Sequence, residues 1–327
     1  MTVRSLASMT ANRRLTTPFT ARTTAAEILD GVDLTGRRMI VTGGASGIGV
    51  ETVRALAGAG ADVTIATRDP RRAEALVEEF AGRGAVSSAA LDLADLESVD
   101  AFVEGWRGPL DVLVANAGIM AIPTRQLTAQ GWEMQLATNF LGHFALALGL
   151  HGSLRAAPAA RVVVVSSGAH RAAPFDFDDP QFERRAYDPW SAYGQSKTAE
   201  TLLAVGITRR WAVDGITANA LNPGYIFTNL QRHMDDDTMR AMGAMDEAGN
   251  LVEADYYKNP AQGASTTVLL AGSPLLAGVA GRYFDDNQEA EVVPGGPDAT
   301  GGVAAHALDP AAADRLWAYA EKAVVTR

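Results

Sequence analysis

The chain has 327 residues, of which 47% are hydrophobic, a formal net charge of −10 and no cysteine. This composition is typical of a globular protein; the acidic balance argues against nucleic acid or an anionic membrane surface as principal partner, and the lack of thiols excludes disulfides and zinc–thiolate sites. No apolar run reaches the roughly 18 residues of a membrane span, so we expect a cytoplasmic protein, and the histidine spacing indicates no metal site.

Residues 1–33 are predicted to form an N-terminal arm ahead of a single domain over 34–327. The first 26 residues contain four arginines among serines and threonines, and the first acidic residue is Glu27. Organelle transit peptides share this composition. Because chain termini are commonly loose, we favour an arm that is either mobile or lies on a neighbouring subunit.

Short Val/Ile/Leu-rich runs alternate with amphipathic stretches from residue 37 onward, which predicts a parallel sheet with helices on both faces. The seven predicted strands are 38–42, 62–67, 85–92, 110–115, 161–166, 216–221 and 282–285. The predicted helices are 48–59, 71–81, 96–106, 131–154, 191–213 and 260–270, with a terminal helix over 309–325. Right-handed crossovers favour one doubly wound α/β Rossmann domain of strand order 3-2-1-4-5-6-7, with ligands at the carboxyl ends of the strands.

Two long segments interrupt this alternation. Residues 169–190 are acidic and aromatic, and residues 225–258 contain four methionines. Long segments beside the ligand end of a sheet are often lids or binding loops. Methionines suit adaptable apolar surfaces, although a helix packed on the core explains them equally well. We expect 169–190 to be an insertion and 225–258 to be a substrate loop.

A glycine-rich turn follows the first predicted strand and opens the first helix. It reads Thr42-Gly43-Gly44-Ala45-Ser46-Gly47-Ile48-Gly49. Its glycines permit a tight turn and a close approach of a pyrophosphate, which the amino terminus of the helix also favours. The position of this turn between a strand and a helix predicts a dinucleotide site.

The end of the second predicted strand bears on the choice of dinucleotide. An NAD-specific enzyme is expected to have an acidic residue there, but Thr67 occupies the place and Arg68 follows it. A guanidinium can bind a 2′-phosphate in a bidentate way. We therefore favour NADP(H), with NAD(H) as the alternative if Arg68 is a solvated partner of Asp69.

Candidate catalytic groups follow in the second half of the chain. Tyr193 and Lys197 are four residues apart, so a helix places them on one face. Hydride transfer to a carbonyl carbon builds negative charge on oxygen and needs a proton donor. A tyrosine of pKa about 10 can serve if a neighbouring ammonium favours its phenolate. Ser166 and Ser167 end the fifth predicted strand, and Asn139 lies in the helix before it.

The TGxxxGxG turn, the Asn-Ala-Gly after the fourth strand, the paired serines, the YxxxK spacing and the PGxxxT segment together resemble the short-chain dehydrogenase/reductase family. Over roughly 23–325 the chain resembles its retinol-dehydrogenase and WW-domain-oxidoreductase-like branch. The resemblance implies that Tyr193 is the acid/base and that Lys197 lowers its pKa and holds the nicotinamide ribose. It further implies that Ser167 orients the carbonyl and that Asn139 anchors a proton-relay water. Ser167 is preferred to Ser166 because the second serine is the family's usual catalyst.

The same resemblance implies a cofactor site. Its expected members are Gly43, Ser46, Gly47, Ile48, Gly49, Arg68, Asp92, Leu93, Asn116, Ala117, Gly118, Tyr193, Lys197, Pro223, Gly224, Ile226 and Thr228. Many NADP-using relatives carry a second basic residue inside the glycine turn, where this chain has Ser46. The histidines are expected to be ordinary surface or packing residues, with His170 and His233 as candidates to line the substrate cleft.

We therefore expect an NAD(P)(H)-dependent oxidoreductase that interconverts a carbonyl and an alcohol on an apolar or bulky small molecule. One alternative is a regulatory protein that binds NADP(H) without turnover. Another is reduction of a conjugated C=C bond, as in light-dependent protochlorophyllide reductase, whose pattern uses an active-site cysteine that this chain lacks. The resemblance implies a homodimer or homotetramer, and a monomer remains open.

Overall fold

The computed structural model describes residues 14–81, 85–241, 243–252 and 254–325. Its main sheet has the strand order β3-β2-β1-β4-β5-β6-β7-β8. The strands are β1 (Arg38–Thr42), β2 (Asp62–Thr67), β3 (Val86–Ala90), β4 (Val112–Ala115), β5 (Arg161–Val165), β6 (Thr217–Asn222), β7 (Tyr283–Asp285) and β8 (Gln288–Glu289). The first seven pair in parallel, which confirms the predicted doubly wound Rossmann fold.

The prediction of seven strands was one short. After β7 the chain reverses at Asp286 and Asn287, whose φ angles are 49° and 65°. Two consecutive positive φ angles are typical of a type I′ hairpin turn. The turn folds β8 back as an antiparallel edge strand on β7, and two residues are too few for a periodic pattern to reveal. A separate parallel pair joins β9 (Val292–Val293) to β10 (Val303–Ala304).

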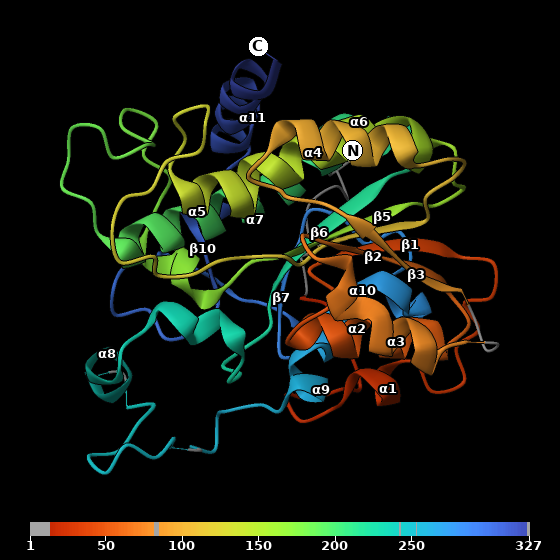
Figure 1. The fold of residues 1–327 in the computed structure, drawn as a ribbon, viewed down its shortest axis with the longest axis horizontal. Coiled ribbons are helices and arrows are strands. Elements are labelled where there is room, and N and C mark those ends of the chain that lie inside the picture. Colours follow the sequence, from red (N-terminus) through yellow and green to blue (C-terminus); the bar gives the residue numbers. More distant parts are fainter. Residues whose placement is uncertain (1–13, 82–84, 242, 253, 326–327) are drawn as a thin grey trace, which may run out of the picture.

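Helices cover both faces of the sheet (Figure 1). On one face lie α4 (Leu96–Gly105), α6 (Gly142–Arg155), α7 (Pro189–Trp211) and α11 (Pro310–Val325), and on the other α1 (Ala25–Ile28), α2 (Ile48–Gly58), α3 (Glu74–Glu79), α9 (Pro260–Gly263) and α10 (Ser265–Gly272). Short helices α5 (Met134–Leu136) and α8 (Asp236–Ala241) lie in connections. Among the described residues, no helix is both long and apolar enough to cross a membrane.

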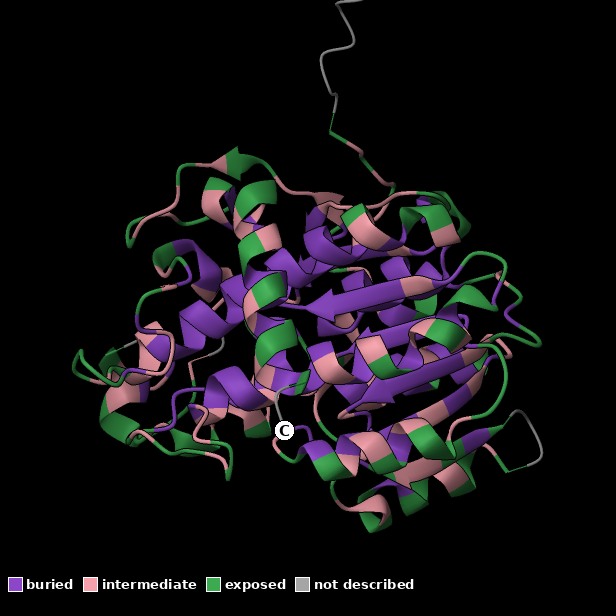
Figure 2. Cartoon of the chain, turned by 90° about the horizontal axis from the view of Figure 1, so that it is seen from above, coloured by how far each residue is buried: buried purple, intermediate pink, exposed green. Residues whose placement is uncertain are grey.

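Two apolar cores separate the sheet from its helical layers. Along β1, Ile40 joins the core with Phe140 and Phe144, whereas Met39 and Val41 face the core on the other side of the sheet. This alternation follows from the two-residue period of a strand. Figure 2 shows that the strands and the inward faces of the helices are buried, so the sheet is a rigid base for residues at its carboxyl edge.

The predicted helix 131–154 is interrupted in the structure. Residues Ala137–Leu141 form a π-helical turn between α5 and α6. Asn139 lies within it, and its side chain bonds to both the amide and the carbonyl of Ile119 across the core. Such π-turns are rare and frequently occur at functional sites.

The predicted N-terminal arm lies partly outside the described residues, which begin at Arg14. From Leu15 onward the chain follows the domain surface, because the Leu15 and Thr17 amides donate to side chains of β8. Thr24 then caps α1, whose Ala25 and Ile28 are buried in the core beside α10.

Candidate active site

A cavity of about 1000 Å³ opens at the carboxyl edge of the parallel strands, where doubly wound sheets bind their ligands. Its wall combines the glycine-rich turn after β1, the segments after β2 to β6 and much of the substrate loop. The predicted cofactor residues that line it are Gly43, Ser46, Gly47, Ile48, Arg68, Asp92, Leu93, Asn116, Ala117, Gly118, Tyr193, Lys197, Pro223, Gly224, Ile226 and Thr228.

Gly49 is the exception among them, because it lies behind the turn instead of in the cavity wall. A Cβ at this position would overlap the carbonyl oxygen of Gly43 and lie 2.9 Å from Asn116 Nδ2. Asn116 Nδ2 in turn donates to the Thr42 carbonyl at 2.8 Å. Gly49 therefore packs α2 directly against the turn, which is the role of the third glycine in a dinucleotide fingerprint.

The segment after β6 closes over this turn. Gly47 has φ 54°, and a Cβ built there would lie 3.4 Å from the Thr228 side chain. Thr228 caps the short helix Asn229–His233, which carries the chain on into the substrate loop. The glycine-rich turn and the segment after β6, which were both predicted to bind the cofactor, therefore lie against each other.

Three arginines line the cavity at its β2 side. Arg68 was predicted from the sequence to lie in the cofactor site, whereas Arg72 and Arg232 were not. Within the described part of the chain, none of the three forms an ion pair, and Asp69 pairs with Arg71 instead of Arg68. Partial shielding from water and the positive charges of Arg68 and Arg72 lower the pKa of Arg232, although the residue is largely exposed. The three guanidinium groups therefore make a cluster suited to an anion.

The Tyr193 phenol is buried on α7 and faces the cavity. Burial raises its pKa above the ordinary value, while the Lys197 charge and a hydrogen bond with the Ser167 hydroxyl act in the opposite direction. The Lys197 Nζ donates to the Val165 carbonyl at 3.0 Å and lies 5.6 Å from the centre of the Tyr193 ring. The structure thus brings Tyr193, Lys197 and Ser167 together.

The two serines have different partners. Ser166 Oγ donates to the Lys197 carbonyl at 2.8 Å and accepts from Thr201 at 3.0 Å, so it fastens β5 to α7. Ser167 caps the short helix Gly168–Ala172 by accepting from the Ala169 amide at 3.2 Å. Ser167, and not Ser166, therefore has its hydroxyl beside the phenol.

Asn139 lies behind the cavity wall and is fully buried. Its Oδ1 accepts from the Ile119 amide, and its Nδ2 donates to the Ile119 carbonyl and to Ser196 Oγ, all at 2.9 to 3.0 Å. Its main-chain oxygen lies 2.7 Å from His143 Nδ1. The side chain therefore supports the wall of the cavity without facing it.

The prediction that His170 and His233 line the cleft was wrong. His170 is buried, with Nδ1 2.6 Å from the Ser167 carbonyl and Nε2 accepting from the Ala304 amide. Burial lowers the pKa of His170 to about 4, so the ring is neutral near pH 7. It links the Ser167 carbonyl to the Ala304 amide of β10 by hydrogen bonds. The neighbouring Arg171 donates to the carbonyls of Ala299 and Gly302.

The wall beside Tyr193 is largely apolar. Met120, Trp190, Leu230 and Met234 cluster around the phenol ring and line the cavity. The insertion 169–190 contributes Trp190 and a few residues at its start, while its central aromatic residues pack against Tyr319 of α11. The segment 225–258 contributes much more of the wall.

Known proteins resemble this chain over most of its length. The family model described as short chain dehydrogenase matches residues 37–239. A protein of Streptomyces lividans named "Probable oxidoreductase" is 70% identical over 88% of this chain and 97% of its own. Human retinol dehydrogenase 14 is 35% identical over 88% of this chain and 85% of its own. Among solved structures, the RhlG/NADP active-site complex of Pseudomonas aeruginosa aligns with a TM-score of 0.60 and 25% identity, covering 78% of this chain and 96% of that one.

Proposed function

The chain belongs to the short-chain dehydrogenase/reductase family and to its retinol-dehydrogenase-like branch, and we propose that it interconverts a carbonyl and an alcohol with NADP(H), using Tyr193 as acid/base. The family makes it an oxidoreductase with a nicotinamide cofactor. One observation carries the finer proposal: the buried Tyr193 and Lys197 and the half-buried Ser167 line the same cavity as the glycine-rich turn.

The residues present fit a phosphorylated dinucleotide. Gly43, Ser46 and Gly47 of the glycine-rich turn line the cavity, and Gly43 packs closely on the segment after β4, since a Cβ there would lie 3.0 Å from the Ala117 Cα. The amino terminus of α2 supports a pyrophosphate. The cluster of Arg68, Arg72 and Arg232 supports a 2′-phosphate, because guanidinium groups bind phosphate oxygens in charge-assisted pairs.

When bound, the reduced nicotinamide supplies a hydride to the carbonyl carbon. The protein residues stabilise the negative charge that develops on oxygen. Ser167 donates a hydrogen bond to that oxygen, and Tyr193 delivers the proton that completes the alcohol. Lys197 lowers the pKa of the phenol and thereby makes the proton easier to release. In the oxidative direction the same phenolate accepts the alcohol proton.

The substrate is proposed to be bulky and apolar beside its carbonyl. Met120, Trp190, Leu230 and Met234 belong to the apolar cluster that contains Tyr193, and transfer of apolar surface from water to such a wall is favourable by about 25 cal/mol per Å². Methionines adapt to irregular ligands. The relatives named above include a retinol dehydrogenase, and retinol is a substrate of this kind.

The test is NADPH oxidation over a panel of ketones, aldehydes, quinones and steroids. Tyr193→Phe is expected to lower kcat by about 10²- to 10⁴-fold, the usual contribution of a general acid, while NADPH binding measured by fluorescence changes little. Tyr319→Phe removes a phenol that bonds to Gln181 outside the cavity and is the matched control. Turnover that is absent from both the wild type and the variant would favour a regulatory protein, and equal turnover in both would overturn the role of Tyr193.

A further inference from the structure

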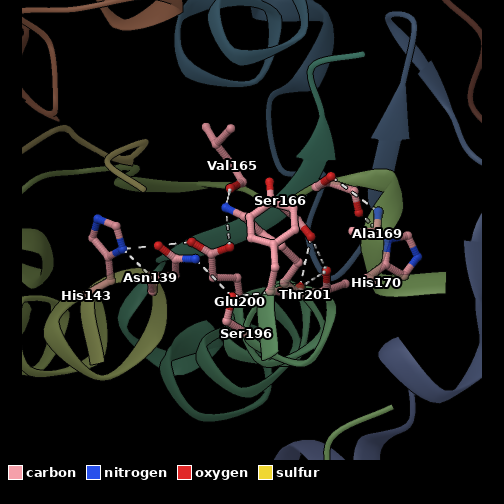
Figure 3. Close-up of polar contacts among 12 residues, drawn as sticks. Asn139, His143, Val165, Ser166, Ala169, His170, Ser196, Glu200 and Thr201 are labelled. Carbon is pink, nitrogen blue, oxygen red and sulfur yellow. Dashed lines mark hydrogen bonds and ion pairs between the residues drawn. The ribbon is translucent and has the colours of Figure 1, made fainter. Parts of the chain in front are cut away.

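Glu200 is a fully buried carboxyl three residues beyond Lys197 on α7. Its Oε2 lies 2.7 Å from Lys197 Nζ. Figure 3 shows the Glu200 side chain beside Asn139 and His143. Glu200 itself does not line the cavity, so it reaches a ligand only through Lys197.

Lys197 is the partner that compensates the charge of Glu200. Within the described residues, no donor other than the Lys197 ammonium hydrogen-bonds to a Glu200 oxygen. Glu133, another fully buried carboxyl, is held differently, because the amides of Gln135 and Leu136 donate to it. A buried charge is costly unless it is paired and hydrogen-bonded. The Glu200 carboxylate therefore depends on one ammonium, whereas the Glu133 carboxylate has backbone donors.

The other titratable groups around Glu200 are Tyr193 on α7 and His143 on α6. His143 Nδ1 lies 3.9 Å from Glu200 Oε1, and His143 Nε2 lies 2.8 Å from Thr42 Oγ1. Burial lowers the pKa of His143 to about 4, so this ring is neutral near pH 7. Lys197 is thus the cation beside Glu200, and Tyr193 is the group on which both charges act.

Protonation of Glu200 changes what Tyr193 experiences. Burial raises the pKa of Glu200 to about 7, although Lys197 opposes the rise. Burial alone would lower the pKa of Lys197, but Glu200 and Tyr193 raise it above its ordinary value. An ionised Glu200 raises the pKa of Tyr193, against the effect of Lys197. A neutral Glu200 leaves the lysine charge unopposed.

We propose that Glu200 is a positioning residue that holds the Lys197 ammonium at the cavity wall and, by gaining or losing a proton, sets the positive charge that Tyr193 experiences. The inference rests on the proposed function for its effect on turnover. Its effect on Lys197 is independent of turnover, because the ion pair is present without any ligand.

The first experiment is a lysine titration without cofactor. The chain has three lysines, Lys197, Lys258 and Lys322, so ¹³Cε-lysine NMR gives few signals, and Lys258→Arg and Lys322→Arg assign them. Glu200→Gln keeps the shape and removes the charge, and it is expected to lower the titration midpoint of Lys197 by about one pH unit or more. An unchanged midpoint would overturn the inference. Glu133→Gln is the matched control and is expected to leave this midpoint in place.

The second experiment is the pH profile of kcat/KM for alcohol oxidation, which requires the Tyr193 phenolate. Glu200→Gln is expected to shift the acidic limb to lower pH by about one unit, because a nearby carboxylate no longer disfavours the phenolate. Glu200→Asp retains a carboxylate and is expected to restore part of the wild-type profile. If Glu200→Gln does not fold, Glu200→Leu is the second neutral variant, with the same expected shifts.

The two proposals fail in different ways. Turnover that survives Tyr193→Phe would overturn the proposed function and leave the lysine titration as the test of Glu200. A Tyr193→Phe variant without turnover, together with a Glu200→Gln profile that superimposes on the wild type, would overturn the Glu200 inference alone.

Discussion

Replacement of Arg232 by alanine is expected to weaken the use of NADPH and to spare the use of NADH. Arg232 lines the cavity with Arg68 and Arg72, and their charges act on it. Three like charges without an ion-pair partner among the described residues repel one another until an anion joins them. NADH lacks the 2′-phosphate that would provide this anion, so Arg232 gives NADH no comparable pairing.

The size of the expected loss depends on how far Arg232 is exposed to water. A hydrogen bond to a charged group contributes about 1.5–3 kcal/mol when it is shielded from water, but the Arg232 side chain is exposed, which reduces the gain. We expect a loss of about 1–2 kcal/mol, which corresponds to about a 5- to 30-fold lower kcat/KM for NADPH. The kcat/KM for NADH should stay within about twofold of the wild-type value.

The assay measures kcat/KM for both cofactors with one carbonyl substrate at two salt concentrations. Arg240→Ala is the matched control, because Arg240 lies in the same loop but pairs with Asp237 and does not line the cavity. The NADPH preference of the wild type should also fall at high salt, since exposed charges are screened. Equal losses for NADPH and NADH, or no loss with either, would refute the role of Arg232.

Two further predictions concern the support of the site. Gly49→Ala should lower the free energy of unfolding by about 1–3 kcal/mol and abolish saturable NADPH binding, because the new methyl group meets the Gly43 carbonyl. Urea denaturation measures the first effect and fluorescence titration the second. The control is Gly58→Ala in the same helix, where a Cβ has open space, and it should change the unfolding free energy by less than about 1 kcal/mol. The buried His143 has its pKa lowered from 6.5 to about 4, so its contribution to stability is present above pH 6.5 and is lost as the pH falls through 4, to a total of about 3 kcal/mol. His143→Gln should therefore show a shallower loss of stability than the wild type between pH 6.5 and 4, and parallel curves would contradict this account.

Local patterns predicted most of the architecture. The strands and the glycine-rich turn were predictable because hydrophobic runs and glycine spacing depend on neighbouring residues alone. The Tyr193 and Lys197 pair was predictable for the same reason, since four residues span one helical turn. The edge strand β8 was missed because two residues carry no period.

Features formed by tertiary contacts were not predictable in this way. The π-turn at Asn139 widens a helix without changing the hydrophobic pattern around it. Arg232 meets Arg68 only because the chain after β6 folds back over the glycine-rich turn. Glu200 offered one usable signal, since a carboxylate three residues after a lysine on a helix lies on the same face, but its complete burial depends on the packing of α7 against the sheet.

The contacts of His170 and Arg171 have a consequence for the order in which the protein matures on the ribosome. The glycine-rich turn has hydrogen bonds to residues near it in the sequence, because the Ser46 amide donates to the Gly43 carbonyl and the Gly43 amide to the Ala66 carbonyl. The turn that carries Ser167 is held instead by the Ala304 amide and the carbonyls of Ala299 and Gly302, which are synthesised more than a hundred residues later. A nascent chain therefore lacks these contacts to the Ser167 turn until residues 299 to 304 have been synthesised.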